Sequence, residues 1–183
     1  MKINVKYFVV LFFIASFYNA SSQNKSTSNV DKLKEDAIQH IQFGYSFYKG
    51  IALQIWDYAE LGYKEEKSSA LLQKTLSDND FNIKAGVAGM PTAFVASYGS
   101  GKLVIAILAE FDALPGLSQE AVPEKKPIEG KNAGHACGHH LFGTASVAAG
   151  IEIKKMLAEK KLSGTVRVYG TPAEEGGDGK VYM

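Results

Sequence analysis

Apolar residues recur every three or four positions over residues 31–61, which is the spacing of a helix with one buried face. Gly44 and Gly50 interrupt this pattern, so we expect the helix to bend near them. A second helix is predicted over residues 65–77, and the residues directly after it are typical of a turn. Its expected inward-facing residues are Ala70, Leu71 and Leu76.

The pattern changes after this turn. Residues 81–100 contain several glycines and predict short strands, of which residues 92–96 give the clearest one. Residues 102–109 form a continuous apolar run rich in branched side chains. This run is too short for a buried helix and is typical of a strand buried on both faces, as in a parallel sheet. Residues 141–160 predict a helix with a small-residue face, and residues 165–170 alternate like another strand.

Residues 102–170 therefore read as strand, loop, helix and strand, which is a parallel crossover unit. We predict an α/β fold with a mostly parallel sheet and flanking helices. In such sheets, binding sites lie beyond the carboxyl ends of the strands. Two acidic pairs occur at those ends, Glu110 with Asp112 and Glu174 with Glu175.

The first residues have a different character. Lys2 and Lys6 precede an apolar run over residues 7–17, and small polar residues follow it. This layout predicts a signal peptide over residues 1–22, cleaved before Gln23, and export to the periplasm or the extracellular space. The alternative is an uncleaved anchor, but the apolar run is shorter than the roughly 20 residues that span a bilayer. Residues 23–30 read as a flexible spacer, and residues 31–183 as the folded part.

Composition narrows the possible functions. The chain has 183 residues, 46% of them hydrophobic, and a formal net charge of +1, which becomes −1 when Lys2 and Lys6 are removed. No basic stripe is present, so nucleic acid is not an expected partner. The single cysteine, Cys137, cannot form an internal disulfide. These features are typical of one globular domain that is stabilised by its hydrophobic core.

Residues 134–140, Gly-His-Ala-Cys-Gly-His-His, hold three of the four histidines and the only cysteine. Thiolate and imidazole are ligands that zinc and neighbouring metals prefer. This segment opens the crossover helix, at the same sheet edge as the two acidic pairs. Cys137, His139 and one carboxylate would therefore form a partial shell for zinc, manganese or cobalt.

The adjacent carboxylates at this edge can have different chemical roles. One of Glu174 and Glu175 can bind metal while its neighbour takes a proton from water. Asp112 can orient a ligand or lie in the second layer around a metal. Two alternatives stay open: a polar surface loop without metal, and a thiol hydrolase in which Cys137 is the nucleophile beside a histidine.

Three motifs, residues 109–117, 134–139 and 170–177, resemble the aminoacylase and glutamate-carboxypeptidase superfamily of di-metal peptidases. Residues 60–66 resemble a segment near the start of its amidohydrolase branch. Within that branch, the chain is most similar to the aminobenzoyl-glutamate utilization protein B group. The resemblance implies a zinc-peptidase-like catalytic domain that hydrolyses the amide bonds of N-acyl amino acid conjugates, either aminobenzoyl-glutamate-like or dipeptide-like.

Carried over by motif, the resemblance implies two divalent metal ions (zinc, manganese or cobalt). It makes Cys137, His139 and Glu175 metal ligands and Glu174 the general base, and it places Asp112 in the catalytic acidic motif. The branch usually has aspartate where this chain has Glu110.

Members of the family continue beyond this length, with further histidine ligands and a lid domain used for homodimers. We therefore expect the chain to be the N-terminal part of a longer enzyme. The alternative from this observation is a truncated relative that binds metal without turnover.

Overall fold

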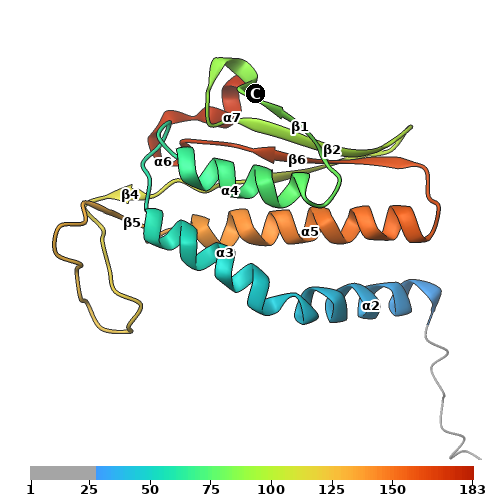
Figure 1. The fold of residues 1–183 in the computed structure, drawn as a ribbon, viewed down its shortest axis with the longest axis horizontal. Helices are drawn as coiled ribbons and strands as arrows, with labels where there is room; N and C mark the ends of the chain where they lie inside the picture. Colours follow the sequence, from blue (N-terminus) through green and yellow to red (C-terminus); the bar gives the residue numbers. More distant parts are fainter. Residues whose placement is uncertain (1–27) are drawn as a thin grey trace, which may run out of the picture. The chain divides into compact units, whose positions relative to one another are not determined.

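The computed structural model describes residues 28–183, and the predicted signal peptide with its cleavage site lies outside them. The chain divides into two compact units, Met1–Asp36 and Ala37–Met183. The folded part that carries the candidate site belongs to the second unit (Figure 1). Within residues 28–183, every helix is too short or too polar to cross a membrane.

The predicted first helix is interrupted at Gly44, as expected. Its two parts are α2 (Asn29–Phe43) and α3 (Tyr45–Tyr58), whereas Gly50 lies inside α3 without breaking it. The helix predicted at residues 65–77 is α4 (Glu66–Ser77). The carboxylate of Glu60 accepts hydrogen bonds from the backbone N–H groups of Lys67 and Ser68, at 3.0 and 2.8 Å. These bonds satisfy donors that a helix leaves unpaired at its first turn.

A four-stranded sheet has the order β1-β2-β6-β3. Its strands are β1 (Asn82–Ala85), β2 (Phe94–Ser100), β3 (Val104–Ala109) and β6 (Gly164–Gly170). A second, two-stranded sheet pairs β4 (Leu114–Pro115) with β5 (Ala133–Gly134). Two very short helices, α6 (Glu174–Gly177) and α7 (Gly179–Tyr182), follow β6.

The α/β class with helices flanking the sheet is confirmed, and so is the parallel crossover from β3 through α5 (His139–Glu159) to β6. The sheet itself is mixed, because β1–β2 and β2–β6 are antiparallel and β3–β6 is the one parallel pair within this four-stranded sheet. The expectation of a mostly parallel sheet is met only around the crossover, which is the part that places the site.

The core lies between the sheet and helices α3, α4 and α5, which Figure 1 shows on one side of it. A Cβ atom on Gly150 of α5 would lie 2.5 Å from the side chain of Val168, so this glycine permits close contact between α5 and β6. The largest fully buried apolar side chains come from the sheet, from these helices and, for Phe111, from the segment after β3: Ile55, Leu72, Leu76, Phe94, Phe111, Val147, Val166 and Val168.

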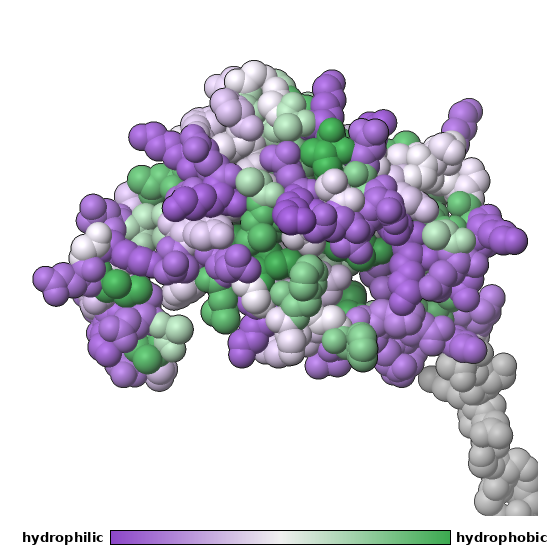
Figure 2. Space-filling view, viewed as in Figure 1, coloured by the Kyte–Doolittle hydropathy of each residue, from purple (hydrophilic) through white to green (hydrophobic). Residues whose placement is uncertain are grey.

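Two burial predictions are wrong. The strand at residues 102–109 is not buried on both faces, because helices α3, α4 and α5 lie on one side of the sheet. In addition, β3 lies at the edge of the sheet and pairs only with β6. Val104, Ile105 and Leu108 are consequently 52%, 43% and 45% exposed. Ala70 of α4 faces solvent, whereas Leu76 is buried as expected. In the same view as Figure 1, Figure 2 shows mostly polar side chains on the surface, with apolar ones gathered near the middle.

Candidate metal centre

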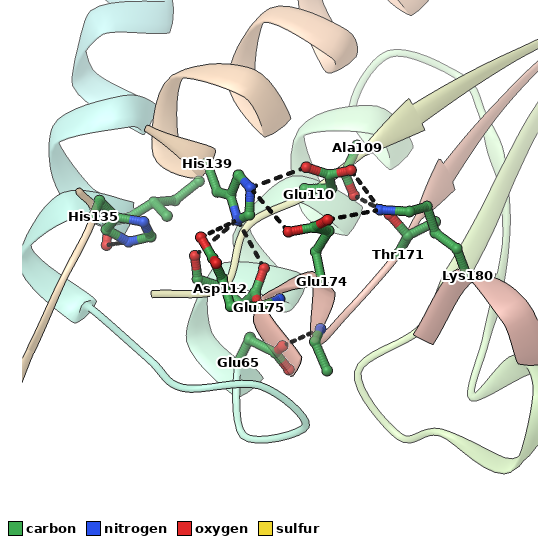
Figure 3. A network of polar contacts seen from close by, with 12 residues as sticks. Glu65, Ala109, Glu110, Asp112, His135, His139, Thr171, Glu174, Glu175 and Lys180 are labelled. Carbon is green, nitrogen blue, oxygen red and sulfur yellow. Dashed lines mark hydrogen bonds and ion pairs between the residues drawn. The ribbon is translucent and has the colours of Figure 1, made fainter. Parts of the chain in front are cut away.

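Three segments distant in the sequence meet beyond the carboxyl ends of β3 and β6 (Figure 3). The backbone N–H of Thr171 donates to the carbonyl of Ala109 at 2.8 Å, which holds the two strand ends together. Glu110 and Asp112 follow β3, Glu174 and Glu175 form α6 after β6, and His139 opens α5. The predicted convergence of these segments is confirmed.

His139 occupies the middle of this cluster and is 7% exposed. Its Nδ1 lies 2.9 Å from Asp112 Oδ1, and its Nε2 lies 3.0 Å from Glu110 Oε2 and 3.7 Å from Glu174 Oε2. The hydrogen bond with Asp112 raises the pKa of His139 more than burial lowers it. Burial alone would raise the pKa of Asp112, but the bond to His139 and the N–H of Glu175 lower it below its usual value. The pair therefore favours a carboxylate that fixes the orientation of the ring.

The three predicted ligands lie close together. Cys137, His139 and Glu175 each offer a ligand atom, and these atoms lie within 4.8 Å of one another. A second group, Glu110, His139 and Glu174, satisfies the same condition.

The residues present fit a metal ion. Glu175 Oε1 is buried and has no hydrogen-bond partner among the described residues, which is costly for a carboxylate oxygen unless a cation binds it. Sulfur, nitrogen and oxygen donors together are typical of zinc and its neighbours.

The thiol of Cys137 has the wrong electrostatics for a nucleophile. Its interaction with the carboxylate of Glu175 raises the pKa of the thiol, and the nearby Glu174 and Asp112 act in the same direction. A nucleophilic cysteine requires the opposite shift, toward the thiolate. The arrangement therefore favours the metal-ligand role over the thiol hydrolase.

His135 and His140 lie beside the cluster and pack against Trp56. The centroid of the His140 ring lies 4.9 Å from that of Trp56 and 5.0 Å from that of His135. His135 Nε2 donates to the carbonyl of Ile55 at 3.0 Å. Burial lowers the pKa of both rings, that of His140 to about 4, so both are neutral near pH 7.

Sequence reasoning did not identify Glu65, which is completely buried. Its Oε1 accepts the backbone N–H of Ala173 at 2.8 Å, and its Oε2 accepts the hydroxyl of Thr92 at 3.0 Å. Ala173 has a φ of 55° and directly precedes Glu174, so this buried carboxylate supports the backbone that carries the predicted base. The only signal in the sequence was the resemblance of residues 60–66 to a family segment.

Lys180 was also not identified from the sequence. Its Nζ lies 2.5 Å from Glu110 Oε1 and 4.0 Å from Glu174 Oε1. A lysine six residues after Glu174 would ordinarily be read as a solvated surface residue. Here α6 and α7 bring it back to the acidic cluster.

Comparison with known proteins agrees with this geometry. Residues 106–183 match the model of Peptidase family M20/M25/M40. A p-aminobenzoyl-glutamate hydrolase polypeptide of Escherichia coli is 48% identical over 138 residues, which are 74% of this chain and 28% of the relative. The Xaa-Arg dipeptidase of Mus musculus is 30% identical over 164 residues, which are 83% of this chain and 34% of the relative.

A solved structure from Bacillus subtilis, described as a dinuclear metal binding peptidase of the M20 family, has a TM-score of 0.62 to this chain at 25% identity. The likeness covers 73% of this chain and 36% of that one. The chain thus spans about a third of the length of these relatives. Taken together, the match of residues 106–183 and the 48% identity over 138 residues identify this part of the chain as part of a domain of peptidase family M20/M25/M40.

Proposed function

We propose that this chain is part of a metal-dependent amidohydrolase that hydrolyses amide bonds in N-acyl amino acid conjugates. The observation that carries the proposal is the convergence on His139 of Cys137 and of carboxylates from two strand ends. The match of residues 106–183 to a peptidase family supports the reaction class.

In this proposal, Cys137, His139 and Glu175 hold divalent metal. Two ions, when bound, polarise the amide carbonyl and make water acidic enough to react near neutral pH. Asp112 keeps His139 in one orientation through the 2.9 Å contact with Nδ1, so Nε2 faces the carboxylates of Glu110 and Glu174. The description of the Bacillus subtilis relative as dinuclear supports the number of ions, and zinc, manganese or cobalt fit the ligands.

Glu174 is the general base of the proposal. Its side chain is 39% exposed, so both water and substrate can reach it, and Oε2 lies 3.7 Å from His139 Nε2. It takes the proton from the attacking water and passes it to the nitrogen of the leaving amine. Its neighbour Glu175 points toward Cys137 and His139, so the two carboxylates have separate tasks.

For the substrate, we propose conjugates of the p-aminobenzoyl-glutamate or dipeptide type, supported by the names of the two relatives. We also propose that residues 1–22 direct export, so that the enzyme acts in the periplasm or outside the cell. A longer polypeptide containing this chain would form a homodimer, as the family resemblance implies.

The test is release of p-aminobenzoate from p-aminobenzoyl-glutamate by the polypeptide encoded by the complete reading frame. Turnover should disappear with a chelator and return with zinc, manganese or cobalt. Glu174→Gln should lower kcat by about 100-fold or more with bound metal unchanged. Glu66→Gln, an exposed control in α4, should be neutral.

Normal turnover by Glu174→Gln would contradict the assignment of the base. Bound metal without turnover of any amide conjugate would instead favour a non-catalytic, metal-binding relative. Activity that resists a chelator but is abolished by a thiol alkylator would favour the Cys137 hydrolase.

A further inference from the structure

We propose that Lys180 is a positioning residue that keeps Glu110 from becoming a metal ligand. The inference rests on the proposed function, because it assumes that His139 binds metal. It assigns a role to a residue outside the predicted ligands and base, and it explains how a carboxylate beside His139 stays outside the predicted ligand set.

The side chains around His139 carry an excess of negative charge unless a cation lies among them. Four carboxylates surround it: those of Glu110, Asp112, Glu174 and Glu175. Among the described lysine and arginine residues, Lys180 is the one that forms ion pairs with this group. Figure 3 shows its side chain reaching toward Glu110 and Glu174.

Glu110 is placed to compete for metal. Because His139 Nδ1 is engaged with Asp112, Nε2 is the ring atom left for an ion. Glu110 Oε2 lies 3.0 Å from that Nε2, closer than the nearest oxygen of Glu174 at 3.7 Å. An ion on Nε2 would therefore attract Glu110 strongly, unless something else holds that carboxylate.

Lys180 binds the carboxylate of Glu110. Its Nζ lies 2.5 Å from Glu110 Oε1, so one oxygen of the carboxylate is already bound to a full positive charge. The side chain of Glu110 is 16% exposed, and this limits screening of the pair by water. Lys180 Nζ also lies 4.0 Å from Glu174 Oε1, so its charge attracts the carboxylate of the proposed base as well.

The position of Lys180 is fixed by its neighbour Gly179. A Cβ atom on Gly179 would lie 2.0 Å from the carbonyl oxygen of Pro172, so only glycine allows this approach. The backbone N–H of Val181 donates to the carbonyl of Asp178 at 2.8 Å and closes the turn. The lysine is thus attached to the same segment that carries Glu174, and it approaches Glu110 from a packed backbone.

The test uses the polypeptide encoded by the complete reading frame and Co²⁺ as the probe, because the visible absorption of Co²⁺ weakens as the number of ligands rises. Lys180→Met should bind Co²⁺ about tenfold more tightly than the natural chain, since a positive charge near the ion is removed. Its absorption per ion should also fall, because Glu110 becomes an additional ligand. Adding Glu110→Gln to Lys180→Met should restore the original spectrum, and Lys180→Arg should keep both the affinity and the spectrum of the natural chain.

Lys154→Met is the matched control. Lys154 forms a 2.8 Å ion pair with Asp80, so its removal deletes the same charge and one ion pair away from the site. An unchanged Co²⁺ spectrum in Lys180→Met would overturn the inference alone. Failure of the natural chain to bind Co²⁺ would overturn the metal site, and with it both the inference and the proposed function. If Lys180→Met alters the spectrum but Lys180→Arg alters it equally, the charge of Lys180 is not the cause and the inference is wrong.

Discussion

Substitutions of Glu65 test how the hydrogen bonds of this buried carboxylate contribute to the stability of the fold, without measuring the chemistry of the site. Glu65 is completely buried, and its two carboxylate oxygens accept one hydrogen bond each, from the N–H of Ala173 and the hydroxyl of Thr92. Glu65→Ala leaves both donors without a partner inside the protein. Glu65→Gln keeps an oxygen that can accept from Ala173 and an amide that can pair with the Thr92 hydroxyl.

The magnitudes of the two changes differ. Each orphaned buried polar group costs about 1–3 kcal/mol. Removing the buried carboxylate also relieves a desolvation penalty, since burial raises the pKa of Glu65. We therefore expect Glu65→Ala to lower the free energy of unfolding by about 3 kcal/mol, and Glu65→Gln by less than about 1 kcal/mol. For a domain of this size, about 3 kcal/mol corresponds to a fall in Tm of roughly 6–12 °C.

The assay is thermal unfolding of the natural chain and both variants, followed by circular dichroism. The pH dependence gives a second signature. Because the pKa of Glu65 is higher in the folded chain, its penalty is absent below the ordinary value of 4.5 and grows as the pH rises through it. Glu65→Gln should therefore become more stable relative to the natural chain as the pH rises from 4 to 7. Equal losses of Tm in the two variants would refute the hydrogen-bond argument.

Three further predictions concern stability at low pH, the exposed strand β3 and the close contact between Gly170 and Phe94. Because the pKa of His140 falls to about 4 in the folded chain, the unfolded chain takes up its proton first as the pH drops below 6.5. Urea titrations should show that His140→Phe removes part of the loss of stability between pH 6.5 and 4, at most about 3 kcal/mol; an unchanged slope would contradict the burial of this ring as a neutral group. Leu108→Lys on the exposed side of β3 should reduce self-association in sedimentation experiments at high concentration. Unaltered association would show that this edge does not mediate self-association. Gly170→Ala places a Cβ 2.0 Å from the ring of Phe94, so it should lower the free energy of unfolding by about 1–3 kcal/mol, and a neutral result would contradict that packing.

Much of the fold follows from patterns within single segments. The break at Gly44, the helix ending at Ser77 and the crossover between β3 and β6 were all predictable, because each depends on local periodicity and on one handedness rule. The exposure of Ile105 and the outward position of Ala70 were not predictable. Both depend on which elements lie next to β3 and α4, and apolar spacing along one segment does not contain that information.

The candidate site was also predictable only in part. Cys137, His139 and the strand-end carboxylates were predictable, because unusual residue types occur together and parallel strands bring their carboxyl ends to one edge. Glu65 and Lys180 were not predictable, since a glutamate in a helical start and a lysine near the end of a segment are ordinary on the surface. Their roles depend on contacts that span 108 residues for Glu65 with Ala173 and 70 for Lys180 with Glu110.

Direct measurement of bound metal tests the central claim. The polypeptide encoded by the complete reading frame is dialysed against Zn²⁺, Mn²⁺ or Co²⁺, and the metal retained per chain is determined by elemental analysis, in parallel with His139→Gln and with His40→Gln as a control histidine in α2. The proposed centre predicts stoichiometric metal in the natural chain and in His40→Gln, with at least about a tenfold loss of affinity in His139→Gln. Equal retention by all three proteins, or retention by none, would contradict a metal centre at the ends of β3 and β6.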